Sequence, residues 1–262
     1  MGAQVDGARH AGYELSYTNV DELMSVIDYL MTYAPPFSES SLVHCPLNAV
    51  LDWPMCMPSD DAKVIVSACE ASPYAIRNGT RLHDRFWIKS QPYSLQEIFT
   101  ASQREIAQRF VGGSVYQAFL SAFNYHRWHA PVSGTVVKAY LIDGTYYSDL
   151  EAEGEDPGGL NDSQGYTTAV AARAVIVIDC DDQALGTVAC VFVGMAEVSS
   201  CVIEAMPSQH VAKGDELGFF QYGGSTYCLI FEPGVIGHFV PQPPFDDKTL
   251  PVKVNAHLAT AR

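Results

Sequence analysis

The sequence predicts an α+β fold in which amino-terminal helices pack on a mostly antiparallel β sandwich. Up to about residue 123, apolar residues recur with helical spacing. After residue 130, the chain turns into short runs of Val, Ile, Phe and Tyr that are bounded by Gly, Asp or Pro. Helical and strand segments that are segregated along the chain are typical of an α+β domain.

Residues 1–58 are predicted to form a helical amino-terminal segment. Its helix begins at Asn19 or Asp21, either of which can cap it, and ends before Pro35. Four apolar residues fall on one face of this helix: Val20, Leu23, Ile27 and Leu30. Residues 59–262 are then predicted to form the main domain.

A second helix is predicted to begin at Ser94 and to run towards Phe110. Ser94 and Glu97 have the spacing of a capping box, in which each side chain bonds the backbone N–H of the other. Gly112-Gly113 would end this helix, and a short helical stretch over 115–123 would follow.

The second half of the chain is predicted to consist of strands. They are expected at 136–142, 171–179, 187–193, 197–204, 216–221 and 227–231. Residues 147–166 are acidic, contain glycine and show no periodicity, so a surface loop is expected there. The tail from Pro241 carries four prolines in eleven residues and is expected to be extended.

The composition limits the partners. The formal net charge is −15, from 30 acidic and 15 basic residues, so nucleic acid and anionic lipid would be repelled. No apolar run reaches membrane-spanning length, and we expect a cytoplasmic protein without stable membrane association. Seven cysteines form no CxxC pair and follow no metal-ligand spacing, so we predict small buried hydrophobes and no metal site.

Gly223-Gly224-Ser225-Thr226 is the first segment that suggests chemistry. A serine hydroxyl can attack the carbonyl of the preceding residue, and flanking glycines let it approach closely. β-Elimination and hydrolysis would then cut the chain between 224 and 225 and turn Ser225 into a pyruvoyl group. The alternative is an ordinary glycine hairpin with a satisfied serine. Another Gly-Gly-Ser, at 112–114, is interpreted as a turn and helix cap.

His126 and His129 form the second such segment. Two histidines three residues apart can share a helix face or flank a turn, and they could serve as a metal pair, as core side chains or as acid–base groups. A third metal ligand at supportive spacing is missing, and Pro131 breaks regular structure directly afterwards.

From about residue 64 to the end, the chain resembles the phosphatidylserine decarboxylase family. The likeness is carried by Tyr-His-Arg-Trp-His-Ala-Pro-Val-Ser-Gly at 125–134 and by the stretch 213–231 around Ser225. It implies self-cleavage, a pyruvoyl cofactor and no pyridoxal phosphate. It also implies that His129 is the base that activates Ser225 and that His126 serves the decarboxylation step. Glu70 would be the carboxylate that orients the base.

Two departures and one discounted likeness accompany this resemblance. Glu70 and Ala71 stand where the family usually has Asp-Gly, which leaves a solvated surface Glu as the alternative for Glu70. Residues 57–63 are shorter than in the relatives. The turns around 130–136 and 204–215 are similar to those of biotinyl and lipoyl carriers, but Pro207 and Ser208 follow Ala205-Met206, where a carrier needs its acceptor lysine. We interpret that likeness as shared architecture.

The stretches 47–55, 86–95 and 192–200 are similar to soluble fungal relatives that decarboxylate aromatic amino acids such as tryptophan. A free L-amino acid is therefore the expected small-molecule substrate. Phosphatidylserine remains the alternative substrate, and a serine hydrolase or a non-processing scaffold remain alternative functions. The absence of a GxSxG motif weighs against the hydrolase. Whether the protein forms a homo-oligomer is left open.

Overall fold

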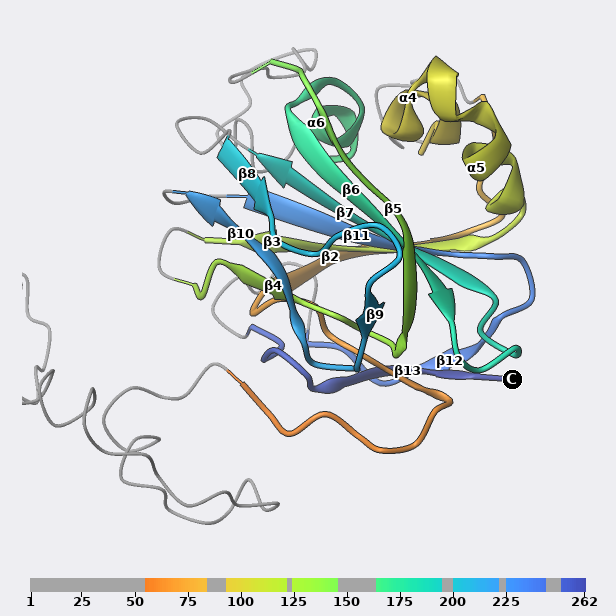
Figure 1. The fold of residues 1–262 in the computed structure, drawn as a ribbon, viewed down its shortest axis with the longest axis vertical. Helices are drawn as coiled ribbons and strands as arrows, with labels where there is room; N and C mark the ends of the chain where they lie inside the picture. The colour runs from red at the N-terminus through yellow and green to blue at the C-terminus, as the bar shows by residue number, and fades with distance from the viewer. Residues whose placement is uncertain are drawn as a thin grey trace, which may run out of the picture. The chain divides into compact units, whose positions relative to one another are not determined.

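A seven-stranded antiparallel sheet organises the protein (Figure 1), in the strand order β2-β3-β11-β7-β6-β5-β9. The computed structural model describes residues 55–83, 93–121, 124–145, 164–194, 200–221, 225–243 and 251–262. These residues belong to one compact unit, Pro54–Arg262. The strands of the large sheet are β2 (Ser72–Asn78), β3 (Ser114–Leu120), β5 (Gly134–Ile142), β6 (Arg173–Cys180), β7 (Thr187–Gly194), β9 (His210–Val211) and β11 (Ser225–Phe231).

Two three-stranded antiparallel sheets complete the β structure, in the orders β4-β10-β8 and β1-β13-β12. Their strands are β1 (Val64–Val66), β4 (Arg127–His129), β8 (Ser200–Ile203), β10 (Glu216–Gln221), β12 (Ile236–Phe239) and β13 (His257–Ala261). Residues of both sheets share one buried cluster with one face of the large sheet, including Ile65, Trp128, Phe220, Leu258 and Phe192. The two small sheets therefore cover that face, and together the layers form a β sandwich.

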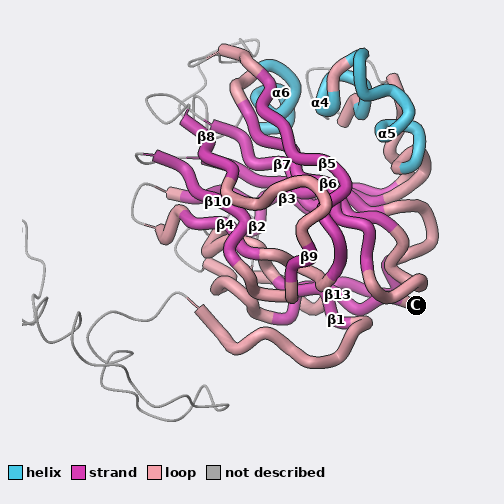
Figure 2. Tube along the Cα trace, in the orientation of Figure 1, coloured by secondary structure: helices cyan, strands magenta, loops and turns pink. Residues whose placement is uncertain are grey.

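Short helices cover the opposite face of the large sheet. They are α4 (Leu95–Phe99), the 3₁₀ turn η1 (Ala101–Gln103), α5 (Arg104–Arg109) and α6 (Gln164–Val170). Figure 2 shows these helices close to one another, while the rest of the described residues form strands and loops. The side chains of Leu95, Phe99 and Phe110 pack against alternate residues of β6, β7 and β11. Because the central strands are buried on both faces, their sequences lack the usual polar alternation.

The six strand predictions for the second half of the chain are confirmed. The strands at these positions begin and end within two residues of the predicted ones, except that residues 197–199 of the predicted 197–204 strand lie outside the described residues. The prediction of a fold rich in antiparallel β structure therefore holds. The buried cysteines, which are Cys69, Cys180, Cys190 and Cys228, are free thiols in the core, as predicted. Burial raises the pKa of each of them.

The helix predictions for 94–123 are wrong on four points. Residues 115–123 were predicted to be helical, but β3 is an inner strand of the large sheet. The glycine turn at 112–113 leads into that strand and caps no helix. The predicted helix from Ser94 to Phe110 is interrupted at Thr100, whose φ is +74°. Ser94 makes no side-chain cap bond, so the predicted capping box does not form.

The predicted amino-terminal helix lies outside the described residues, as does most of the predicted 147–166 loop, and the predicted boundary at residue 58 stays a prediction. The last residues of that loop begin α6 instead. Within the described ranges, no helix has the length and apolar character needed to cross a membrane.

Candidate active site

Ser225 is the first residue of β11 and lies inside the large sheet. It pairs with Leu120 of β3 and with Gly194 of β7, so both edges of β11 are occupied at this residue. The side chain is fully buried, and its hydroxyl has no hydrogen-bond partner among the described residues. An unpaired buried hydroxyl costs about 1–3 kcal/mol, so its retention needs an explanation. Gly223 and Gly224 lie outside the described residues.

The face of the sheet that carries Ser225 also carries a cluster of aromatic rings. Successive strand residues point to opposite faces, so Ser225 shares its face with Tyr227 and with Phe192, the residue that pairs with Tyr227. The Trp128 ring stacks on Phe192 with centroids 4.1 Å apart, and Phe220 meets Trp128 edge-on at 4.9 Å. Aromatic rings therefore pack on the face of the sheet that carries Ser225.

Gly218 of β10 makes room for the indole of Trp128. A Cβ at position 218 would lie 2.1 Å from the carbonyl oxygen of Val202 and 2.9 Å from Cε3 of Trp128. Only glycine lets β10 run this close to its neighbours. The indole Nε1 of Trp128 is buried and has no partner among the described residues.

His126 precedes β4 and lies on the Ser225 side of the structure. Its ring meets Phe220 edge-on with centroids 6.3 Å apart, and its carbonyl accepts a hydrogen bond from the Phe220 N–H at 2.9 Å. Its Nε2 is buried and has no hydrogen-bond partner among the described residues. Burial lowers the pKa of His126, while the Asn124 backbone and the charge of Glu70 act in the opposite direction. A lowered pKa keeps the imidazole neutral, which is the form that can accept a proton.

His129 lies at the other end of β4, and both of its ring nitrogens have partners. Its Nδ1 bonds the carbonyl of Gly214 at 2.8 Å, which requires that Nδ1 donate, and its Nε2 faces the hydroxyl of Tyr125 at 3.2 Å. The rings of Tyr125 and His129 stack with centroids 5.8 Å apart. With Nδ1 donating, Nε2 accepts the hydroxyl proton of Tyr125.

Glu70 follows β1 and contacts the same segment of chain. Its Oε2 accepts a hydrogen bond from the Tyr125 N–H at 2.7 Å. We expected Glu70 to orient His129, but the carbonyl of Gly214 occupies the nitrogen that such a bond would use. The charge of Glu70 acts on His126 instead. The side chain is half-buried and bonded, so the alternative of a solvated surface Glu does not describe it.

The sequence prediction did not assign roles to Tyr125, Trp128 or Phe220. Tyr125 and Trp128 belong to the histidine motif, and the strand spacing of that motif is the signal that could have separated them by face. No local signal points to Phe220, because its contact with His126 joins residues 94 positions apart.

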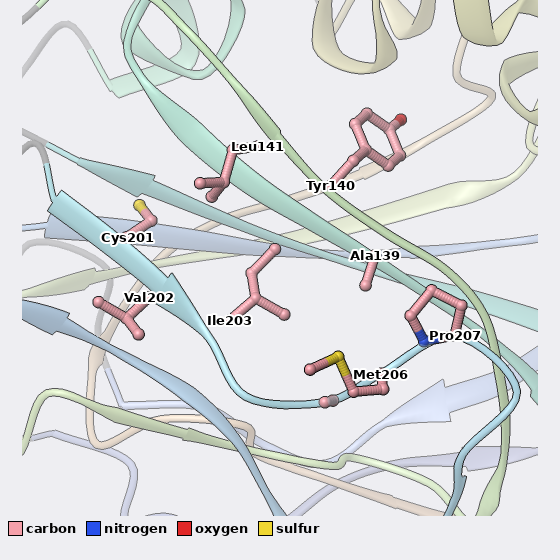
Figure 3. Close-up of a pocket in the computed structure, with 9 residues that line it drawn as sticks. Ala139, Tyr140, Leu141, Cys201, Val202, Ile203, Met206 and Pro207 are labelled. Carbon is pink, nitrogen blue, oxygen red and sulfur yellow. The ribbon is translucent and has the colours of Figure 1, made fainter.

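A shallow groove elsewhere on the surface has a volume of about 420 Å³ (Figure 3). It runs between β5 and β8, and its lining is mostly apolar, with Leu141, Ile203 and Met206 among the side chains. None of the predicted site residues lines it. Among the described residues, no group of three or more His, Cys, Asp or Glu side chains could hold a metal ion.

The sequence model described as phosphatidylserine decarboxylase matches residues 54–247, and a second model with the same description matches residues 3–64. The first match covers well over half of the chain, including every candidate site residue. The chain belongs to the phosphatidylserine decarboxylase family. This membership confirms the resemblance drawn from the histidine and Gly-Gly-Ser motifs.

Similar proteins include two fungal decarboxylases and a phosphatidylserine decarboxylase proenzyme. A decarboxylase of Amanita muscaria named iboD is 40% identical over 185 residues, which is 66% of this chain and 53% of the relative. An L-tryptophan decarboxylase of Psilocybe cubensis is 34% identical over 190 residues, which is 70% of this chain and 43% of the relative. A phosphatidylserine decarboxylase proenzyme of Clostridium novyi is 28% identical over 182 residues, which is 66% of this chain and 55% of the relative. The chain thus spans about half the length of these relatives.

Proposed function

We propose that this chain is a pyruvoyl-dependent decarboxylase of a free L-amino acid, matured by cleavage of its own backbone between Gly224 and Ser225. The observation that carries the proposal is that two candidate residues each hold a buried polar atom with no hydrogen-bond partner among the described residues, Oγ of Ser225 and Nε2 of His126. A hydroxyl and an imidazole nitrogen without other partners are suited to bond to each other or to a reacting group.

Maturation would proceed through an ester, a dehydroalanine and its hydrolysis. Oγ of Ser225 attacks the carbonyl carbon of Gly224, the C–N bond breaks, and an ester forms with a free amine at residue 225. Loss of the α-proton of residue 225 then breaks the Cβ–Oγ bond and releases Gly224 as a carboxylate. The resulting dehydroalanine takes up one water and loses ammonia, which leaves a pyruvoyl group. Ser225 fits this role because it begins a strand and its side chain is shielded from solvent water.

We assign the base of this step to His126 and no longer to His129. Two observations support the change: the Nε2 of His126 has no hydrogen-bond partner among the described residues, and the charge of Glu70 acts on His126. Glu70 would stabilise the imidazolium that forms when the hydroxyl proton is taken. The hydroxyl of Tyr125 lies 3.2 Å from Nε2 of His129, and a hydrogen-bonded pair of this kind suits a later proton transfer during turnover.

The ketone of a pyruvoyl group supplies an electron sink for the carbanion that is left when carbon dioxide departs. The chain's own contribution is to keep the reacting carbon in an apolar, water-poor setting and to deliver one proton. An aromatic amino acid such as tryptophan is the substrate we propose. The names of the Psilocybe relatives support this choice. The net charge of −15 disfavours an anionic phospholipid surface.

Intact-mass spectrometry tests the maturation. We expect two chains, residues 1–224 and the 38 residues 225–262, the second lighter by the conversion of serine to pyruvoyl. Ser225→Ala should yield only the full-length chain, and two chains in that variant would refute the cleavage site. His126→Ala should stay uncut and His129→Ala should be cut, so the reverse pattern would return the base to His129.

One set of assays tests both the substrate and the functional class of the protein. Matured protein incubated with carboxyl-labelled L-tryptophan should release labelled carbon dioxide without added pyridoxal phosphate. Release of carbon dioxide from phosphatidylserine vesicles but not from L-tryptophan would overturn the amino-acid assignment. A single intact chain that reacts with a fluorophosphonate would indicate a serine hydrolase, although a fully buried hydroxyl disfavours that function. An intact chain with neither activity would indicate a scaffold.

A further inference from the structure

The face of β11 opposite to Ser225 carries a buried network of polar side chains. Thr226, the next residue along the strand, donates its hydroxyl proton to the carbonyl of Ala118 at 2.9 Å. The same hydroxyl accepts a hydrogen bond from Nε2 of Gln117 at 3.1 Å. Thr226 and Gln117 are both fully buried. The network thus ties β11 to β3 by side chains, in addition to the backbone ladder.

Two further elements fix Gln117 in place. Its Oε1 accepts the hydroxyl proton of Tyr93, and its Nε2 also donates to the hydroxyl of Thr168 on α6 at 3.0 Å. Burial raises the pKa of Tyr93 well above its ordinary value, so the phenol keeps the proton that it donates. The donors and acceptors run in one consistent direction, from Tyr93 through Gln117 and Thr226 to the Ala118 carbonyl. Such a network holds its members in one arrangement.

Cleavage would change what this network has to hold. In the intact chain, Ser225 continues from residue 224, but after the cut it becomes the first residue of a separate chain. Chain termini fray unless something ties them down. The first side chain beyond the new terminus is that of Thr226, which is held on two sides.

We propose that Gln117 and Thr226 form a clamp that positions the pyruvoyl terminus after the backbone has been cut, an inference that rests on the proposed function. The clamp acts from the helix-covered face of the sheet, while the chemistry takes place on the other face. Both residues are positioning residues, because neither side chain lies on the face of the large sheet that carries Ser225. Their contribution is therefore to turnover and not to the cut itself.

The test removes the hydroxyl of Thr226 without changing its shape. Thr226→Val should still be cut to completion, whereas kcat for L-tryptophan, counted per phenylhydrazine-reactive carbonyl, should fall on the order of 10-fold to 100-fold with a smaller change in KM. Thr226→Ser keeps the hydroxyl and should restore kcat. Gln117→Met, which removes the donor, should reproduce the loss. Thr187→Val removes another fully buried hydroxyl at the far end of β7 and should leave kcat unchanged.

Hydrogen exchange gives a readout that does not depend on the substrate. In the cut protein, Thr226→Val should speed exchange of the amides at 226–228 by about 5-fold to 10-fold. In the uncut Ser225→Ala background, the same substitution should change their exchange little. Unchanged kcat and exchange in the cut protein, or an equal effect in the uncut background, would overturn the clamp. A wild-type chain that is never cut would refute the proposed function instead.

Discussion

Replacing Ser225 by alanine should make the uncut protein more stable. Ser225 Oγ is fully buried and bonds to no described residue, so its removal relieves a penalty of about 1–3 kcal/mol. A midpoint shift of about 2–4 °C per kcal/mol applies to a unit of this size, so the thermal midpoint should rise by at least about 2 °C. Ser67 provides the matched control. It is equally buried, but it donates to the Cys69 carbonyl and lies 2.8 Å from the Tyr227 hydroxyl, so Ser67→Ala should destabilise by about 1–3 kcal/mol.

The comparison needs chains that cannot be cut. Both substitutions are therefore made in a background with His126→Leu and His129→Leu, which removes either candidate base and keeps the site filled. Calorimetry and urea unfolding at one pH give the midpoints and the free energies of unfolding. If Ser225→Ala lowers the midpoint as Ser67→Ala does, the serine hydroxyl has a partner in the uncut protein and the reasoning fails.

Three further predictions concern the same unit. Glu70→Gln removes a charge that raises the pKa of His126, so the neutral imidazole should persist to lower pH. The acid limb of the cleavage rate, followed by gel after cell-free synthesis, should therefore shift to lower pH while the maximal rate falls; an unchanged pH profile would remove Glu70 from the site. Gly218→Ala should cost about 3 kcal/mol or more because its Cβ would meet the Val202 carbonyl, whereas Gly234→Ala, at φ +80° in open space, should cost about 1–2 kcal/mol in urea unfolding. Arg173→Met should lower the free energy of unfolding by about 2 kcal/mol or more, because Arg173 donates to the carbonyls of Glu97, Ile98 and Ala171, and Arg173→Lys should not restore it.

Six strands of the second half were predictable because each has a β-rich composition and clear glycine, proline or aspartate boundaries, whereas β9, β12 and β13 were not predicted. β3 was not, because it is an inner strand with both faces covered. Its buried residues run on without alternation, and a short run of that kind cannot be told from a buried helix by periodicity. The break at Thr100 depends on a positive φ that nothing in the local sequence requires.

The candidate residues themselves were predictable from their motifs, but their partners were not. The spacing of His126 and His129 suggested a shared helix face or a turn, whereas β4 separates the two rings. His126, which precedes β4, meets Phe220, while His129, the last residue of β4, meets Tyr125 and Gly214. Which histidine Glu70 acts on follows from tertiary packing and could not be read from spacing.

The position of β11 decides what would become of the two pieces after a cut. Its seven residues pair with β3 on one side and with β7 on the other, and β13 from the same carboxyl-terminal piece pairs with β1. The strands of the 38-residue fragment would therefore stay paired with strands of the larger fragment. The two pieces should co-purify in the absence of denaturant. Once separated by urea, the pieces must find each other again by diffusion, so recovery of structure should depend on protein concentration. The uncut chain carries no such dependence, and maturation would thus convert a unimolecular folding reaction into a bimolecular one.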